Sequence, residues 1–166
     1  MIISREHIRS RRGTLKLGEA VIISDPSMDY EPKWTHKVPI LQGEYKAVKR
    51  VIRDEKYKVI SAIYIYHESI TAEEMENLDL LQHGLKDILV ESGLCGIYSE
   101  NFYAKMVRDG TWTQLCCDIK TGQTKTYREA VIASSGYGDG LYNAYFHYTD
   151  AKNRINGILI TFIECR

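Results

Sequence analysis

The sequence feature that most constrains the fold is the segment 57–67, in which β-branched and aromatic residues follow one another almost without interruption. In an extended chain, successive side chains point to opposite faces. One face here would carry Val59, Ser61, Ile63 and Ile65, and the other Ile60, Ala62, Tyr64 and Tyr66. Because both faces are largely apolar, both must be covered. The segment therefore predicts a central strand of a sheet.

Further strands are predicted wherever Tyr, Ile and Val cluster between Gly, Asp and Asn. They cover residues 19–24, 36–41, 44–51, 86–91, 112–119, 128–135, 141–148 and 155–164. Gln42-Gly43 separates two of these segments and predicts a hairpin between them.

Two helices are predicted. Thr71 and Glu74 form a capping box, in which the hydroxyl and the carboxylate each satisfy a backbone amide of the first turn. Apolar residues then recur at helical spacing, and Gly84 predicts the end of that helix. A second short helix is predicted after Ser99, over residues 102–107.

These elements predict a β-rich α+β domain: a bent antiparallel sheet or partial barrel of about eight or nine strands with one or two short helices. The 166 residues suit a single domain, 1–166, without repeat or linker. Residues 1–17 would form a basic N-terminal arm or short helix, and residues 18–166 the β-rich core. The basic residues of this arm are Arg5, Arg9, Arg11, Arg12 and Lys16. They would either be open to solvent or contact a phosphate-bearing ligand or an acidic partner.

Charge and hydropathy exclude some classes of function. Lys+Arg and Asp+Glu both number 22, so general nucleic-acid binding is not expected, because it needs a basic surface. No secretory signal and no apolar run near ~18 residues is visible, which predicts a cytoplasmic protein without a membrane segment. The 4 cysteines lack zinc-ligand spacing and are expected to be reduced thiols. Cys116 and Cys117 would point to opposite faces of a strand.

The most unusual segment is 134–140, Ser-Ser-Gly-Tyr-Gly-Asp-Gly. One interpretation is a hairpin with Asp139-Gly140 as its turn. The other is a ligand-lining loop whose backbone amides serve as anion donors. The segment is neither a P-loop nor a dinucleotide-binding loop, since the lysine and the following helix are missing.

Three segments occur in one order: Ser-Asp-Pro at 24–26, Glu-Ser-Gly-Leu-Cys-Gly-Ile at 91–97, and the glycine-rich segment 134–140. Together with Cys116-Cys117 they resemble an uncharacterised family of small bacterial and phage proteins, a domain of unknown function. That family carries Ser-Asp-Pro, Asp-Ser-Gly-x-x-Gly, Cys-Cys and Ser-Ser-Gly-Tyr-Gly-Asp-Gly. The resemblance spans residues 18–165. Glu91 stands where the family has Asp, and Asn143 where it often has Pro. The resemblance implies a common fold and site, but no activity.

Three acidic residues lie in these segments: Asp25, Glu91 and Asp139. They would either bind a divalent cation and support hydrolysis, or cap turn amides and hold loops together. His67, at the end of the central strand, would be a general base or a hydrogen-bonded structural histidine. The sequence contains no recognisable motif that pairs a nucleophile with a base.

The first hypothesis is a non-enzymatic cytoplasmic binding protein that holds a small polar ligand or a protein partner. If the resemblance to phage proteins extends to function, the partner is a host component. Its site would comprise Asp25, Glu91, Ser92, Ser134, Ser135, Gly136, Tyr137, Gly138 and Asp139. The alternatives are a metal-assisted hydrolase that uses the three carboxylates and a structural subunit that self-assembles through strand edges. The sequence assigns no cofactor, catalytic residue or metal ligand, and an oligomer stays open.

Overall fold

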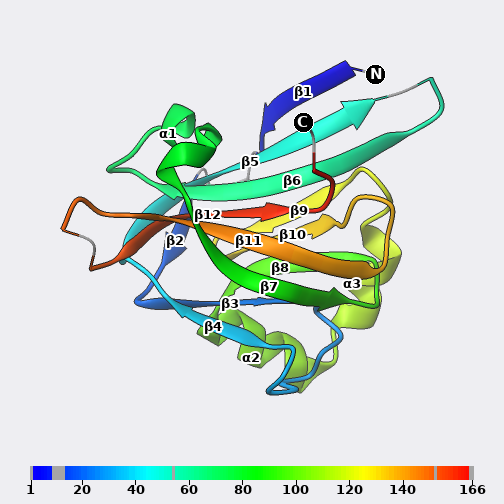
Figure 1. Ribbon diagram of the computed structural model, residues 1–166. Coiled ribbons are helices and arrows are strands. Elements are labelled where there is room, and N and C mark those ends of the chain that lie inside the picture. Colours follow the sequence, from blue (N-terminus) through cyan, green and yellow to red (C-terminus); the bar gives the residue numbers. More distant parts are fainter. Residues whose placement is uncertain (1, 9–13, 54, 152, 165–166) are drawn as a thin grey trace.

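The structure is a computed structural model that describes residues 2–8, 14–53, 55–151 and 153–164. Over these residues, twelve strands form two antiparallel sheets, and Figure 1 shows the sheets stacked on each other. The seven-stranded sheet has the order β1 (Ile2–His7), β5 (Gly43–Arg53), β6 (Lys58–His67), β12 (Ile155–Thr161), β11 (Gly140–Tyr148), β7 (Gln82–Val90), and β2 (Leu15–Leu17) also pairs with β5. The five-stranded sheet has the order β4 (His36–Pro39), β3 (Ala20–Ser24), β8 (Leu94–Ser99), β10 (Ala130–Ser134), β9 (Thr124–Tyr127).

The predicted central strand is confirmed as β6, which lies between β5 and β12. A bulge changes its side-chain alternation. Arg50 pairs with Ala62 and Val51 with Ile60, which leaves Ser61 as the extra residue. Because a bulge inserts one residue into the alternation, Ile60 joins Ile63 and Ile65 in the core between the sheets, although strict alternation placed it on the other face.

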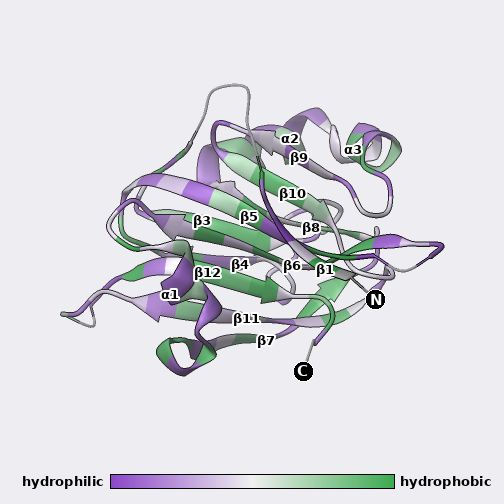
Figure 2. Cartoon of the chain, turned by 90° about the horizontal axis from the view of Figure 1, so that it is seen from above, coloured by the Kyte–Doolittle hydropathy of each residue, from purple (hydrophilic) through white to green (hydrophobic). Residues whose placement is uncertain are grey.

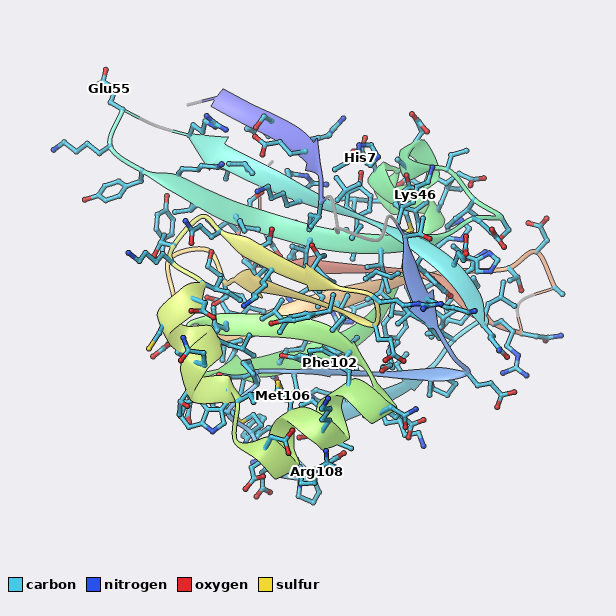
Figure 3. The ribbon with its side chains drawn as sticks, turned by 180° about the vertical axis from the view of Figure 1, so that it is seen from behind. His7, Lys46, Glu55, Phe102, Met106 and Arg108 are labelled. Atoms are coloured by element: carbon cyan, nitrogen blue, oxygen red, sulfur yellow. The ribbon has the colours of Figure 1, made fainter. Side chains whose placement is uncertain are left out.

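Apolar side chains cluster both between the sheets and on their outer faces, and Figure 2 shows the hydrophobic residues along the strands. Helix α1 (Ala72–Glu76) packs on the outer face of the seven-stranded sheet, with Met75 fully buried. Helices α2 (Glu100–Asp109) and α3 (Trp112–Asp118) cover the outer face of the five-stranded sheet. Figure 3 shows Phe102 and Met106 of α2 directed toward the sheet and Arg108 directed away from it. The β-rich α+β class is confirmed, as two stacked sheets without a closed barrel in the described part of the chain.

The capping box is confirmed, but the first helix is shorter than predicted. The Thr71 amide donates to Glu74 Oε2 at 2.9 Å, and the Glu74 amide donates to Thr71 Oγ1 at 3.3 Å. Helix α1 then ends at extended Asn77, whose side chain caps the 3₁₀ turn Leu78–Leu80. Gly84 is not a helix end: it lies in β7, where a Cβ would come within 2.3 Å of the Phe146 ring.

Two further predictions are wrong. Residues 112–119, predicted as a strand, contain helix α3, because helical spacing places both Leu115 and Ile119 against the five-stranded sheet. Cys116 and Cys117 therefore lie on a helix. Gln42-Gly43 is no hairpin turn either: β4 pairs with β3, and the chain then crosses to the other sheet to begin β5. The helix predicted after Ser99 is confirmed as α2, with Ser99 as its N-cap.

Where residues 1–17 are described, they form strands β1 and β2 rather than an arm or short helix. Strand β1 pairs with β5, and the guanidinium of Arg5 lies 2.8 Å from the Glu76 carboxylate. Arg9, Arg11 and Arg12 lie outside the described residues. None of the described helices is long and apolar enough to cross a membrane.

Two glycines with positive φ provide a test of the packing. Gly122 (φ +81°) lies where a Cβ would come within 2.4 Å of the Lys58 carbonyl oxygen, whereas Gly110 (φ +63°) faces open space. Gly110→Ala is expected to lower the free energy of unfolding by about 1 kcal/mol, the cost of the left-handed conformation alone. Gly122→Ala is expected to lower it by roughly 2 kcal/mol more, because backbone must also move. Urea unfolding of both variants checks this; equal losses would contradict the packing of this turn.

Candidate functional site

The predicted site residues meet at one end of the stacked sheets. Residues 91–93 carry the chain from β7 in the seven-stranded sheet to β8 in the five-stranded sheet. Residues 135–139 cross in the opposite direction, from β10 to β11. The hairpin interpretation of the glycine-rich segment is therefore wrong, because the strands on either side of it belong to different sheets. The turn after β3 lies beside both crossings, since Ser24 pairs with Gly96 and Ser134 with Leu94.

Asp25 connects these segments through its carboxylate, which is fully buried. Oδ1 accepts hydrogen bonds from the amide and the hydroxyl of Ser27, both at 2.8 Å, and from the Ser92 hydroxyl at 2.6 Å. Oδ2 accepts from the amides of Glu91 and Ser92, both at 2.7 Å. The carboxylate thus caps its own turn and also fixes a segment that lies 66 residues further along the chain.

These five hydrogen bonds favour the structural interpretation of Asp25 over a metal-ligand role. A buried carboxylate is stable when backbone amides and hydroxyls satisfy its oxygens, and both oxygens here are occupied. The side chains of Glu91 and Asp139 are exposed. Across the described ranges, no group of three or more His, Cys, Asp or Glu side chains is arranged to hold a metal ion.

The glycine-rich segment forms a tight turn that several hydrogen bonds hold in place. The Gly138 amide donates to the Ser135 carbonyl at 2.7 Å, and Gly136 takes the positive φ of +54° that this turn needs. The Tyr142 hydroxyl donates to the carbonyls of Ser135 and Gly138. The Ser135 amide donates to the Gly93 carbonyl at 3.0 Å, which joins this turn to the segment fixed by Asp25.

A cavity of about 320 Å³ lies between these turns and helix α3. We call it the glycine-loop pocket. Of the predicted residues, those that line it are Ser92, Ser134, Ser135, Gly136 and Gly138. Asp25 is buried in the scaffold, and Glu91, Tyr137 and Asp139 lie outside the lining. Tyr137 is 73% exposed.

Three polar lining residues were not predicted: Cys116, Lys120 and Thr121. Cys116 belongs to α3, and the other two follow that helix. The incorrect strand prediction for 112–119 therefore hid this wall of the pocket. The wall is joined to the glycine-rich segment by the Gly122 amide, which donates to the Ser134 hydroxyl at 2.9 Å.

The pocket offers hydroxyls, backbone groups and one ammonium, but no activated nucleophile. Burial, and next the nearby negative charge of Asp25, raise the pKa of the Cys116 thiol, so it stays protonated at neutral pH. The Ser92 hydroxyl already donates to Asp25. No histidine lies among the described lining residues. His67 does not line this pocket, and its contacts agree with the hydrogen-bonded alternative: Nδ1 contacts the Ser69 hydroxyl at 2.8 Å, and Nε2 the Gln42 carbonyl at 3.2 Å.

No family model, curated protein or solved structure matches this chain. The resemblance to the bacterial and phage family therefore stays a prediction.

The role of Asp25 predicts a large effect from an isosteric change. In Asp25→Asn, the amide group must replace either Oδ1 or Oδ2, and each of these oxygens accepts at least two hydrogen bonds. Donors would then face donors, and the free energy of unfolding is expected to fall by about 3 kcal/mol. The control Asp139→Asn, at an exposed position, should stay within about 0.5 kcal/mol of the parent. A small loss for Asp25→Asn in urea unfolding would show that the carboxylate is not a structural hub.

The thiols of α3 are expected to differ in reactivity. Cys117 is exposed, whereas Cys116 is half-buried with a raised pKa. Because the thiolate is the reacting form, iodoacetamide at pH 7.5 should alkylate Cys117 at least about tenfold faster than Cys116. The single variants Cys116→Ser and Cys117→Ser separate the two rates by mass spectrometry. Faster reaction at Cys116 would contradict this prediction. It would indicate an activated thiol and support a catalytic role for Cys116.

Proposed function

We propose that this protein is a non-enzymatic binding protein that holds a small polar ligand in the glycine-loop pocket. The observation that carries the proposal is the convergence of three distant segments on one cavity with polar walls. Hydrogen bonds from the amides of residues 91 and 92 to Asp25, and from Tyr142 to the carbonyl of Ser135, hold two of these segments in place, so the pocket is preformed. A preformed site avoids the ordering cost that weakens binding.

The lining indicates the chemistry of the ligand. The volume of about 320 Å³ is at the small end of the range for ligand sites. The lining residues with hydrogen-bond donors are Ser134, Thr121 and Lys120, whereas the Ser92 hydroxyl already donates to Asp25. We therefore expect a small molecule whose carboxylate, carbonyl or hydroxyl groups accept hydrogen bonds. The free thiols Cys95, Cys116 and Cys117 support a reducing compartment, the cytoplasm, as the place of action.

A protein partner is the second candidate, and exposed apolar residues beside the pocket favour it. Tyr137 and Leu141 are 73% and 57% exposed; Tyr137 belongs to the crossing between β10 and β11, and Leu141 lies at the start of β11. An exposed aromatic residue on a rigid turn is typical of an interface anchor. This partner would be the host component if the protein is phage-encoded.

The other two hypotheses have less support. Assembly through strand edges is opposed by Lys37 and Pro39 on the short edge strand β4 and by the bulge at Asp87 (φ +58°) on edge strand β7. Charges, proline and bulges are the devices that block edge pairing. The metal-assisted hydrolase loses Asp25 as a ligand, because both oxygens of this carboxylate accept hydrogen bonds.

Native mass spectrometry of the full chain, purified gently from a lysate, tests the proposal. A discrete extra mass per protomer, lost on denaturation, is expected. In Thr121→Trp, an indole enters the pocket from an exposed lining position, and the extra mass should fall at least about tenfold in occupancy. The matched control is Thr111→Trp, which is also exposed but lines a different cavity, and it should retain the mass.

Three results would count against this reading. A bare protomer mass would contradict tight carriage of a small ligand. Equal occupancy in Thr121→Trp and the parent would place the ligand outside the glycine-loop pocket. A bound protein lost in Tyr137→Ala but kept in Thr121→Trp would replace the small ligand with the protein partner.

A further inference from the structure

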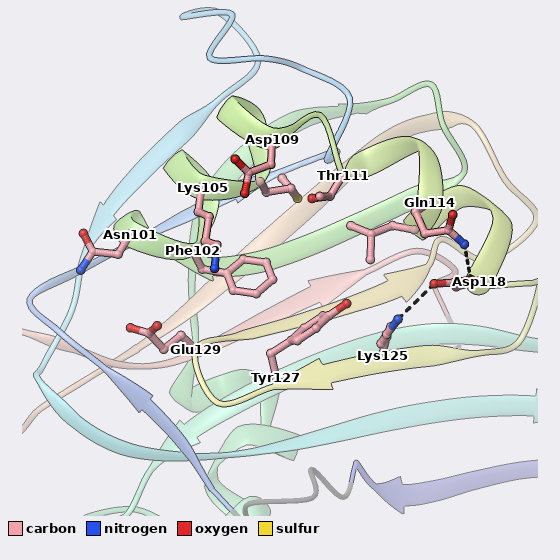
Figure 4. A pocket seen from close by; sticks show the side chains of 12 residues that line it. Asn101, Phe102, Lys105, Asp109, Thr111, Gln114, Asp118, Lys125, Tyr127 and Glu129 are labelled. Carbon is pink, nitrogen blue, oxygen red and sulfur yellow. Dashed lines mark hydrogen bonds and ion pairs between the residues drawn. The ribbon is translucent and has the colours of Figure 1, made fainter.

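A second, larger cavity lies on the other side of helix α3. It measures about 510 Å³ and is bounded by α2, α3 and β9 (Figure 4). Consecutive residues of α3 face the two cavities: Leu115 lines this one and Cys116 the glycine-loop pocket. We call the second cavity the aromatic pocket. Its volume lies within the range of small-molecule sites.

The floor of the aromatic pocket is apolar and contains two rings. The centroids of Phe102 and Tyr127 are 4.8 Å apart at an interplanar angle of 48°. Both side chains are only partly buried, and Figure 4 shows their rings between α2 and β9. Buried Met106 and Leu115 complete the floor. A thioether adapts its shape and contacts ring edges favourably, and exposed ring surface offers stacked or edge-on contacts to another ring.

The charged residues at the rim balance one another. Lys125 lies 3.1 Å from the Asp118 carboxylate, and Gln114 donates to the same carboxylate at 2.8 Å. Asp109 pairs with Arg108 at 3.1 Å. The remaining charged rim residues, Lys105 and Glu129, have opposite signs. The rim therefore attracts neither cations nor anions as a class, but Gln114 and its partners offer hydrogen bonds on one wall.

We propose that the aromatic pocket is a binding site for a flat, uncharged aromatic molecule with a single polar group. The rings of Phe102 and Tyr127 contact its plane or edge, and the Gln114 wall receives its polar group. This site is independent of the glycine-loop pocket and of the function proposed for it.

Titration of the ¹⁵N-labelled full chain with indole, followed by NMR, tests the proposal. Indole is flat, uncharged and carries one N–H donor. Saturable shifts are expected for amides of α2, α3 and β9, with a dissociation constant on the order of 1 mM. Cyclohexanol is of similar size but has no aromatic face, so it should bind at least about fivefold more weakly.

The two tryptophan variants locate the site. Thr111 is exposed, lines the aromatic pocket and makes no side-chain cap bond to α3, so Thr111→Trp fills the cavity at little structural cost. Indole affinity should fall at least tenfold in Thr111→Trp and stay within twofold in Thr121→Trp. If Thr111→Trp does not fold, Gln114→Trp fills the cavity from another exposed position of the same wall.

Each other outcome overturns the proposal. Absence of saturable shifts, or unchanged affinity in the filled variant, would show that the cavity does not bind aromatic molecules. Equal loss in both variants would show that the site is not separate from the glycine-loop pocket. Equal affinity for cyclohexanol would remove the aromatic class of ligand.

Discussion

The buried carboxylate of Asp25 is the interaction on which the site depends. It draws together a turn after β3 and the crossing between the two sheets at residues 91–92, which are far apart in the chain. A carboxylate taken out of water is costly unless its oxygens are satisfied, and five short hydrogen bonds meet that need here. Charge-assisted bonds of this kind are stronger than neutral ones. The adjoining turn at 135–138 is joined to this crossing by the hydrogen bond from the Ser135 amide to the Gly93 carbonyl.

Helix α3 forms a wall of both the glycine-loop pocket and the aromatic pocket. It lies on the outer face of the five-stranded sheet, where Leu115 and Ile119 pack against the strands. The polar turns lie on one side of the helix and the aromatic side chains of α2 and β9 on the other. Two cavities of opposite character therefore share one short wall.

The parts that could be predicted from the sequence are those governed by local patterns. The double apolar face of β6 predicted a central strand, and Thr71 with Glu74 predicted the start of α1. The segments around 25, 91 and 134–139 were grouped from the sequence and do lie together, although only five of the nine predicted residues line the pocket. The division of the strands between two sheets could not be predicted, because it depends on contacts between residues that are distant in sequence. For the same reason, nothing local to Asp25 indicated that the amides of Glu91 and Ser92 would be its partners.

The prediction of residues 112–119 failed for a different reason. Trp, Thr and Cys favour strands in isolation, but tertiary packing of Leu115 and Ile119 decides for a helix. The alternation in β6 failed at Ser61, since a bulge leaves no local signature in that apolar run. The role of Gly84 was misjudged because its cause, the ring of Phe146, comes from a strand 62 residues later (146 − 84).

Amide hydrogen exchange at Glu91 and Ser92 tests the central claim most directly. Neither residue belongs to a helix or strand, so protection of their amides must come from the Asp25 carboxylate. The account predicts that both amides exchange as slowly as those of the neighbouring buried strand β8, through global unfolding. Exchange as fast as that of an unprotected amide would contradict it, because the carboxylate would then not hold this crossing in place.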